Sequence, residues 1–405
     1  MSADRAPWWR VLLTPGGWLT LGVLVRLAHL LTLGQDPLFG DAAEYEQIAL
    51  RILHGQPLGE ASPRAPVYPL FLALGFWIGG EENYLAPRLL QLGLVLVQML
   101  LVHKLATRLG GPAAAGFAAP LVAFTPTLVF VTGLLYPTTL YATLLLAVTW
   151  LAWELAERPG VLRAAALGAL MVIGWLTDLI FLAPALAVGV WLLVAASRRR
   201  GPLLAALAVT AVTGLVLAVP YLGAMRAQRS DRIFLGKAQA VLHFARTDSL
   251  ISRPRWIRMP MGTPFIPLPV RAFVAREAGL FRASPVAYAH DVVFEFFHFF
   301  QPLPDRVTTR NRFNTPWVLW VGAAWFALLL PLAVLGVFRG AAPLSGRLLL
   351  AAIVFATAGF YAFFFSQTRY RIPVEPQLLL LASLALATAF PRLGRLWADT
   401  AESRP

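Results

Sequence analysis

The stretch GDAAEYEQIALRILHGQPLGEASPRAPVYPLF, residues 40–71, sets this sequence apart from an ordinary series of membrane spans. It directly follows a hydrophobic run over residues 12–34. It carries two neighbouring carboxylates, Asp41 and Glu44, and then an arginine, Arg64, ahead of a proline-rich turn. Because charged groups are costly inside hydrocarbon, we expect this stretch to lie at one face of a membrane.

The composition of the whole chain is that of a membrane protein. Of the 405 residues, 58% are hydrophobic and only 13% are charged, whereas a soluble domain carries roughly 25% charged residues. Many apolar runs approach the ~20 residues that cross the hydrocarbon core as a helix. These runs are continuous rather than alternating, which disfavours a β-barrel. The sequence therefore predicts an all-α polytopic membrane protein.

We expect about ten transmembrane helices in a single transmembrane domain, residues 1–405. They are predicted at residues 12–34, 85–107, 113–133, 138–156, 163–177, 179–197, 203–224, 315–338, 347–365 and 374–391. Residues 35–84 are a predicted first outer loop, in which 67–79 is too short to cross and should lie in the interface. Residues 225–315 are a predicted long outer loop. No small-residue cleavage site follows the first span, so we expect it to be retained.

The basic residues of the short connections indicate the orientation of the chain. They follow every second span, on the same side as Arg5 and Arg10. Because cytoplasmic loops carry an excess of Lys and Arg, both termini are predicted in the cytoplasm. The composition, rich in Ala, Leu and Arg, is compatible with a bacterial genome, so we expect a bacterial inner membrane. The net charge of +14 then serves topology and phospholipid headgroups, and we expect no nucleic-acid partner. The absence of cysteine excludes disulfides and thiol chemistry.

Asp41 has two interpretations that the spacing leaves open. Residues 41–53 place apolar side chains at helical spacing, which is typical of an amphipathic interfacial helix. In the first interpretation, Asp41 caps this helix and Glu44 completes a capping box. In the second, Asp41 is a base at the membrane surface that accepts a proton from an acceptor hydroxyl.

Arg64 also has two interpretations. It either reaches lipid phosphate from the interface, or it neutralises a phosphate leaving group through its planar guanidinium. The prolines around it fix an extended backbone, which would hold a positioned side chain rigidly in either case.

Three short motifs occur in order on the predicted outer face: DAAEYEQIA at 41–49, RAPVYP at 64–69 and RYRIPVEP at 369–376. Together they resemble the membrane glycosyltransferases of the GT-C type. The resemblance is greatest to glycosyltransferase family 39, the bacterial relatives of protein O-mannosyltransferases, and to lipid A aminoarabinose transferase. It covers most of the chain in topology and these three stretches in motif.

The resemblance implies an inverting glycosyltransferase that moves a sugar from a polyprenyl-phosphate carrier to an acceptor, without a metal or another cofactor. It implies that Asp41 binds or activates the acceptor, with Glu44 and Tyr45 nearby. It implies donor-phosphate contacts at Arg64, Arg369 and Arg371. The expected partners are a lipid-linked sugar donor, membrane lipids, and a glycan, lipid or protein as acceptor.

The chain departs from the family pattern at two places. Many members carry a glutamate near the position of Tyr136, and many carry a basic residue where this chain has Asp178. These differences leave the identity of the sugar and of the acceptor open.

Four further residues are candidates for supporting roles in the site: Tyr68, Lys237, Arg26 and Asp178. Arg26 lies inside the first predicted span, where a charge costs about 2.5–3.5 kcal/mol on insertion scales. We favour a structural ion pair between Arg26 and Asp178 over a donor-site role for either residue.

The segment from His290 to His298 also holds Asp291 and Glu295 at helical spacing. A metal site is one interpretation, although no known motif is matched. The favoured interpretation is an amphipathic surface helix that packs its phenylalanines.

Two other functions stay open as alternatives. A transporter or lipid flippase needs charged groups through the bundle and commonly has inverted repeats, whereas the conspicuous polar residues here gather on one face. A non-catalytic protein that binds lipid-linked sugar is distinguished from an enzyme only by an assay. The asymmetry of the polar residues favours chemistry at one interface.

Overall fold

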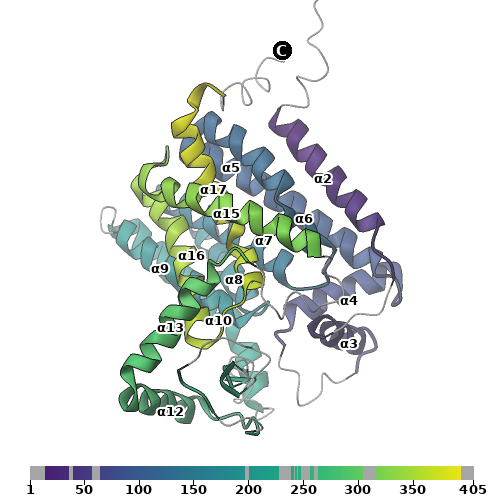
Figure 1. Ribbon diagram of the computed structural model, residues 1–405, viewed down its shortest axis with the longest axis vertical. Coiled ribbons are helices and arrows are strands. Elements are labelled where there is room, and N and C mark those ends of the chain that lie inside the picture. Colours follow the sequence, from purple (N-terminus) through teal and green to yellow (C-terminus); the bar gives the residue numbers. More distant parts are fainter. Residues whose placement is uncertain are drawn as a thin grey trace, which may run out of the picture.

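The computed structural model describes residues 14–35, 40–56, 64–196, 200–227, 239–240, 242–243, 245–247, 256–259, 263–303 and 316–393. Every regular element in these ranges is helical, which confirms the all-α prediction (Figure 1). Within them, six helical stretches are long and apolar enough to cross a membrane: α5 (Leu85–Phe124), α7 (Thr138–Glu157), α10 (Arg200–Ala227), α15 (Pro316–Arg339), α16 (Leu344–Phe364), and the continuous stretch of η2 (Thr368–Val374) and α17 (Glu375–Ala389). The chain is therefore a multi-pass membrane protein.

Shorter apolar helices accompany these six. They are α2 (Pro15–Leu31), α4 (Val67–Gly79), α8 (Val161–Trp175) and α9 (Leu182–Ala196). Helices α2, α8 and α9 coincide with predicted spans but have 17, 15 and 15 residues, fewer than the ~20 of a typical span. The predicted number of ten spans therefore stays a prediction, although a helix stands at each predicted position.

Helix α5 contains two antiparallel arms joined at Gly111. Gly111 has φ 73° and ψ −169°, a conformation that glycine adopts without steric cost. Met99 of the first arm and Ala123 of the second both pack against Gly22 of α2, and Arg88 Nε donates to the Gly133 carbonyl at 3.1 Å. The arms correspond to the predicted spans 85–107 and 113–133. The second arm breaks near Thr125 and continues as α6 (Pro126–Gly133).

Helix α17 is the centre of the bundle. It packs against α5, α15 and α16, among which it lies in Figure 1. Nearly every residue from Glu375 to Ala387 is buried. A helix that is apolar on all sides is expected in the interior of a bundle, so α17 is a fixed support for the segment that precedes it, η2 (Thr368–Val374).

The predicted interfacial helices are present with the predicted bounds. Helix α3 (Asp41–Leu53) buries Tyr45, Ile48 and Ala49 and packs against α4. The long loop contains two more helices, α12 (Val270–Ala283) and α13 (Pro285–Phe299), and a 3₁₀ turn, η1 (Leu179–Phe181), precedes α9. Helices α3 and α12 lie at the same end of the molecule in Figure 1.

Candidate active site

Asp41 is the first residue of α3, and its side chain does not cap the helix. The N-cap residue is Gly40, with φ 55°, and no side-chain hydrogen bond caps this helix. The predicted capping box of Asp41 and Glu44 is therefore wrong. Both carboxylates instead contact Arg64, because an ion pair with a guanidinium is a stronger interaction than a cap on a helix whose first N–H groups can be solvated.

Arg64 binds both carboxylates with one side chain. Its Nη2 lies 2.6 Å from Asp41 Oδ1 and 2.7 Å from Glu44 Oε2, and its Nε donates to Glu44 at 2.8 Å. The side chain of Arg64 is only 6% exposed, and its Cζ lies 4.9 Å from the centre of the Tyr45 ring. Burial acts to lower the pKa of Arg64, but Tyr45 and Asp41 raise it above its ordinary value. The guanidinium therefore stays charged.

Arg369 approaches Asp41 from the opposite end of the sequence. Its Nη2 lies 3.8 Å from Asp41 Oδ2, and its Cζ lies 5.5 Å from the Tyr370 ring. Tyr370 in turn stacks on Tyr361 of α16 with ring centres 4.5 Å apart. The Asp41 carboxylate, whose side chain is 38% exposed, thus lies between Arg64 and Arg369. When this carboxylate moves away or shares the two guanidinium groups, they can bind another anion.

Tyr136 is the residue of this centre that sequence reasoning missed. It lies between α6 and α7, close enough to Arg369 and Asp41 for both to shift the pKa of its hydroxyl. Burial raises its pKa, Arg369 lowers it, and Asp41 raises it, with a net rise. The sequence offers two signals: its place in the predicted outer turn between two spans, and the glutamate that many members of the resembled family carry near this position. The departure from the family pattern at this position thus puts a phenol beside the two arginines.

Tyr68 supports the centre from behind. Its ring packs edge-on against Tyr45 at 5.1 Å between centres, and its hydroxyl donates to Gln91 Oε1 at 3.2 Å. Tyr68 is fully buried, so it fixes the position of Tyr45 and, through α3, that of Asp41.

Arg371 lies in a different environment from Arg369. It is buried, its Nη1 donates to the Gln301 carbonyl, and its Nε lies 3.5 Å from Glu375 Oε1. Its Cζ also lies 3.5 Å from the centre of the Phe326 ring. These contacts fasten η2 to α15, α17 and the end of α13. A donor-phosphate contact at Arg371 stays a prediction.

The predicted ion pair between Arg26 and Asp178 is wrong. Arg26 donates to the carbonyls of Gly22, Val122 and Ala123 at 3.0, 3.0 and 2.6 Å. The physical reason is Pro126, which has no N–H to give to the Val122 carbonyl. Asp178 accepts from the Ile180 N–H at 3.3 Å and begins η1. Lys237 lies outside the described residues.

The segment from His290 to His298 belongs to helix α13, as predicted, but Asp291, Glu295 and His298 are buried and Phe297 is exposed, so the prediction of a surface helix that packs its phenylalanines is right only in part. Asp291 accepts from the backbone N–H groups of Trp256 and Ile257 at 2.9 and 3.2 Å, and Glu295 accepts from that of Ser366 at 2.8 Å. No group of three or more His, Asp or Glu side chains that could hold a metal is found among the described residues. The acids instead attach α13 to neighbouring backbone.

No family model and no curated protein matches this chain. Solved structures do match. ArnT, an aminoarabinose transferase, from Cupriavidus metallidurans bound to undecaprenyl phosphate is 19% identical with a TM-score of 0.61, and its apo state is 18% identical with a TM-score of 0.60. Each match covers 95% of this chain and 62% of that one.

A third match is the Archaeoglobus fulgidus oligosaccharyltransferase tethered with an acceptor peptide. It is 15% identical, with a TM-score of 0.53 over 95% of this chain and 50% of that one. The chain therefore spans less than two thirds of the length of these three structures. Both proteins are GT-C glycosyltransferases. At these identities the likeness establishes the fold, and the chain accordingly has the GT-C membrane fold that its motifs and topology predict.

Proposed function

We propose that this protein is an inverting glycosyltransferase that moves a sugar from a polyprenyl-phosphate carrier to an acceptor at the outer face of the membrane. The observation that carries the proposal is the carboxylate of Asp41 between Arg64, from the same predicted outer loop, and Arg369, from a distant part of the chain. The likeness in fold to an ArnT structure that holds undecaprenyl phosphate supports a lipid phosphate as the ligand.

The proposed reaction is a direct displacement. The acceptor hydroxyl attacks the anomeric carbon of the sugar and forms the new C–O bond. Asp41 accepts the hydroxyl proton. The bond from the anomeric carbon to the phosphate oxygen breaks on the opposite face, and polyprenyl phosphate leaves with that electron pair. Arg64 and Arg369 stabilise the charge that develops on the leaving phosphate.

The ion pairs of Asp41 with Arg64 and Arg369 allow a bound phosphate to take over part of the contact with the two arginines. An arginine next to a carboxylate favours the ionised carboxylate and makes it a weaker base. When a phosphate occupies Arg64 and Arg369, Asp41 shares these cations with a second anion, and its affinity for a proton rises. Glu44 keeps one edge of Arg64 in place during the exchange. Donor binding would thus activate the base.

The proposal includes the orientation predicted from the loops. Both termini lie in the cytoplasm of a bacterial cell, and the centre around Asp41 lies on the other side of the inner membrane. Residues 1–405 act as one transmembrane unit, and the acceptor is a glycan, a lipid or a protein.

The test compares purified wild type, Asp41→Asn and Glu82→Gln. Each is incubated with a panel of polyprenyl-phosphate sugars and a cell-envelope extract as the source of acceptor, and the release of free polyprenyl phosphate is measured. Glu82 is an exposed carboxylate between α4 and α5, so Glu82→Gln is the matched control for the loss of one negative charge. Matching thermal unfolding of the three proteins shows that all are folded.

Turnover in wild type and in Glu82→Gln that falls at least about a hundredfold in Asp41→Asn is the expected result. Equal turnover in all three would remove Asp41 from the mechanism and direct attention to Glu44. Absence of turnover with every donor in the panel would contradict the enzyme proposal. Direct measurement of donor binding and of lipid transfer across vesicles would then test the binding and flippase alternatives.

A further inference from the structure

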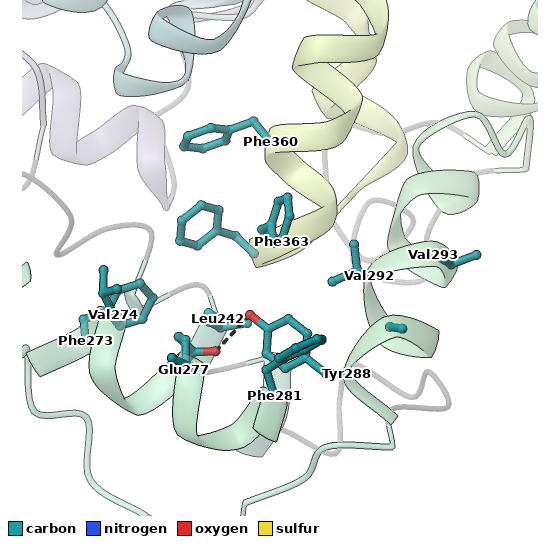
Figure 2. A pocket seen from close by; sticks show the side chains of 13 residues that line it. Leu242, Phe273, Val274, Glu277, Phe281, Tyr288, Val292, Val293, Phe360 and Phe363 are labelled. Carbon is teal, nitrogen blue, oxygen red and sulfur yellow. Dashed lines mark hydrogen bonds between the residues drawn. The ribbon is translucent and has the colours of Figure 1, made fainter. Parts of the chain in front are cut away.

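An apolar cavity of about 610 Å³ lies between α12, α13 and the end of α16. Figure 2 shows Phe360 and Phe363 on the α16 side and Phe273 and Phe281 on α12. Helix α16 is long and apolar enough to cross the membrane, and Phe363, in its last turn, is 55% exposed. An apolar hollow that opens beside a membrane helix fits a hydrocarbon chain better than water or a polar ligand.

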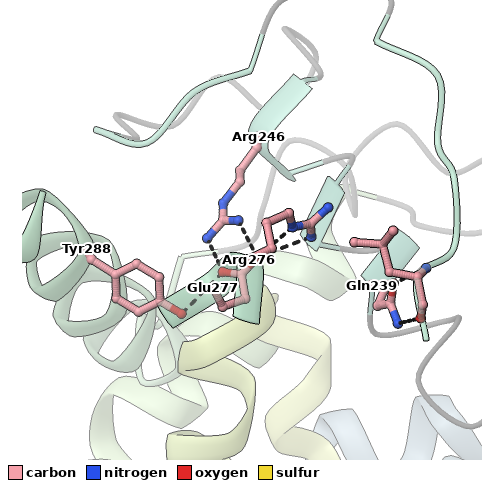
Figure 3. A network of polar contacts seen from close by, with 6 residues as sticks. Gln239, Arg246, Arg276, Glu277 and Tyr288 are labelled. Atoms are coloured by element: carbon pink, nitrogen blue, oxygen red, sulfur yellow. Dashed lines mark hydrogen bonds and ion pairs between the residues drawn. The ribbon is translucent and has the colours of Figure 1, made fainter. Parts of the chain in front are cut away.

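One end of this cavity is closed by polar side chains. Glu277 and Tyr288 line it at the opposite end from Phe360 (Figure 2). Arg246 binds both oxygens of Glu277 at 2.9 Å, Arg276 lies 3.1 Å from Glu277, and the Tyr288 hydroxyl donates to it at 3.3 Å (Figure 3). Glu277 is only 11% exposed. Because its oxygens already have partners, this end is a barrier to an apolar chain and not a second binding group.

The other end of the cavity is joined to the candidate active site by aromatic rings. Phe360 packs edge-on against Tyr361 at 6.4 Å between centres. Tyr361 stacks on Tyr370 at 4.5 Å, and Arg369 lies over Tyr370 at 5.5 Å. A phosphate bound at Arg369 would therefore have an aromatic wall leading from it to the Phe360 end of the cavity.

We propose that this cavity holds the isoprene units nearest the phosphate of the lipid-linked donor. The chain passes the wall formed by Tyr370, Tyr361 and Phe360, is turned by the polar end at Glu277, and leaves into the bilayer past the exposed Phe363. This assignment rests on the proposed function, since it takes the donor phosphate to lie at Arg369. The assignment identifies the face of the bundle formed by α12, α13 and α16 as the one that receives the donor.

The charge of α12 agrees with an anionic lipid. The helix carries Arg271, Arg276 and Arg282 against a single carboxylate, Glu277, and its apolar residues Val274 and Phe281 are exposed beside the cavity. Basic residues on an amphipathic helix attract anionic lipid headgroups at the interface. The competing apolar surface is the exposed side of α4, which the test treats as the alternative.

The test uses the full chain in vesicles and a polyprenyl phosphate that carries a diazirine in its first isoprene units. After irradiation, the labelled peptides are identified by mass spectrometry. We expect labelling of α12, α13 or α16 that an excess of unlabelled polyprenyl phosphate abolishes. Photoreactive phosphatidylglycerol in parallel vesicles is the control for contact with any lipid.

Three results would overturn the assignment. They are competed labelling confined to another segment such as α4, labelling of the cavity helices that phosphatidylglycerol reproduces, and absence of competed labelling anywhere. The first of these leaves the glycosyltransferase proposal intact, because the donor is still bound. The turnover assay with Asp41→Asn decides that proposal independently of where the chain lies.

A pair of variants tests the cavity by filling it. Ala278 lines the cavity, whereas Ala272 is exposed on the opposite face of the same helix. Ala278→Phe should raise the KM for the donor about tenfold with kcat nearly unchanged, and Ala272→Phe should behave as wild type. Equal KM values for the two variants would contradict the assignment. The labelling of the wild type stands as a test even where Ala278→Phe fails to fold.

Discussion

Arg64 donates to Asp41 and Glu44 at the same time, so the planar shape of its guanidinium matters as well as its charge. A lysine keeps the charge but cannot reproduce two parallel contacts. Arg64→Lys should lower kcat/KM for the donor about tenfold, with part of the loss in kcat because Arg64 stabilises the leaving phosphate, as measured by release of free polyprenyl phosphate. Arg51→Lys, at an exposed position of α3, is the control. Identical kinetics for the two variants would show that the paired contacts play no part.

Tyr136 gives a second test at the scale of a residue. Tyr136→Phe removes the hydroxyl whose pKa Arg369 lowers, and the loss of a polar contact with a charged group costs about 1.5–3 kcal/mol. We expect kcat/KM to fall about tenfold or more without a change in Tm.

Burial raises the pKa of Tyr136, so its phenol stays protonated at neutral pH and into the alkaline range. The pH–rate profiles of wild type and Tyr136→Phe should therefore have the same shape, with activity lost on the acid side as Asp41 becomes protonated. If the activity of the wild type falls at alkaline pH and that of Tyr136→Phe does not, the phenol itself titrates during the reaction.

Local motifs were enough to select Asp41, Arg64 and Arg369, because each lies in a short polar stretch at the end of an apolar run. They could not select Tyr136, whose role depends on a contact with a residue more than 200 positions away and which alone reads as an ordinary interfacial tyrosine. The same limit explains the wrong capping box. Spacing fits a cap equally well whether or not a distant cation such as Arg64 competes for the carboxylates.

At the scale of the element, α5 depends on the backbone of Gly111. Its φ of 73° is unfavourable for a residue with a Cβ, although the space around it is open. Gly111→Ala should therefore destabilise the protein by about 1–3 kcal/mol through backbone strain alone. Thermal unfolding in detergent measures this. Gly93→Ala, also without a neighbour within 4 Å but in regular helix, should be neutral or slightly stabilising. A Tm for Gly111→Ala equal to that of Gly93→Ala would contradict the strain.

The bounds of most helices followed from hydropathy, because a membrane helix must be apolar over its length and its ends carry polar residues. The break between α5 and α6 did not. The predicted span 113–133 runs through Pro126, whose missing N–H leaves the Val122 carbonyl without its helical partner. Arg26 of another helix donates to this carbonyl and to that of Ala123 instead. Hydropathy averaged over a window does not reveal hydrogen bonds from one helix to the backbone of another. For the same reason the sequence alone predicts an acidic partner for Arg26.

At the scale of the whole molecule, the fold brings four separate segments together around one carboxylate. They are the start of α3, the stretch before α4, the turn between α6 and α7, and η2. In the predicted topology, every one of these segments lies on the same side of the membrane. The proposed chemistry at the outer face therefore requires the predicted orientation of the chain in the membrane.

The native chain contains no cysteine, so a single introduced thiol reports on sidedness without background. Ser284, between α12 and α13, and Ser345, at the start of α16, are both exposed serines, and the topology places them on opposite sides. A membrane-impermeant maleimide should label Ser284→Cys in intact spheroplasts and should label Ser345→Cys only after the membrane is permeabilised. The reverse pattern would place the centre around Asp41 in the cytoplasm and would contradict transfer at the outer face. Labelling of both in intact cells would mean that α15 does not cross the membrane, since it is the one predicted span between the two positions.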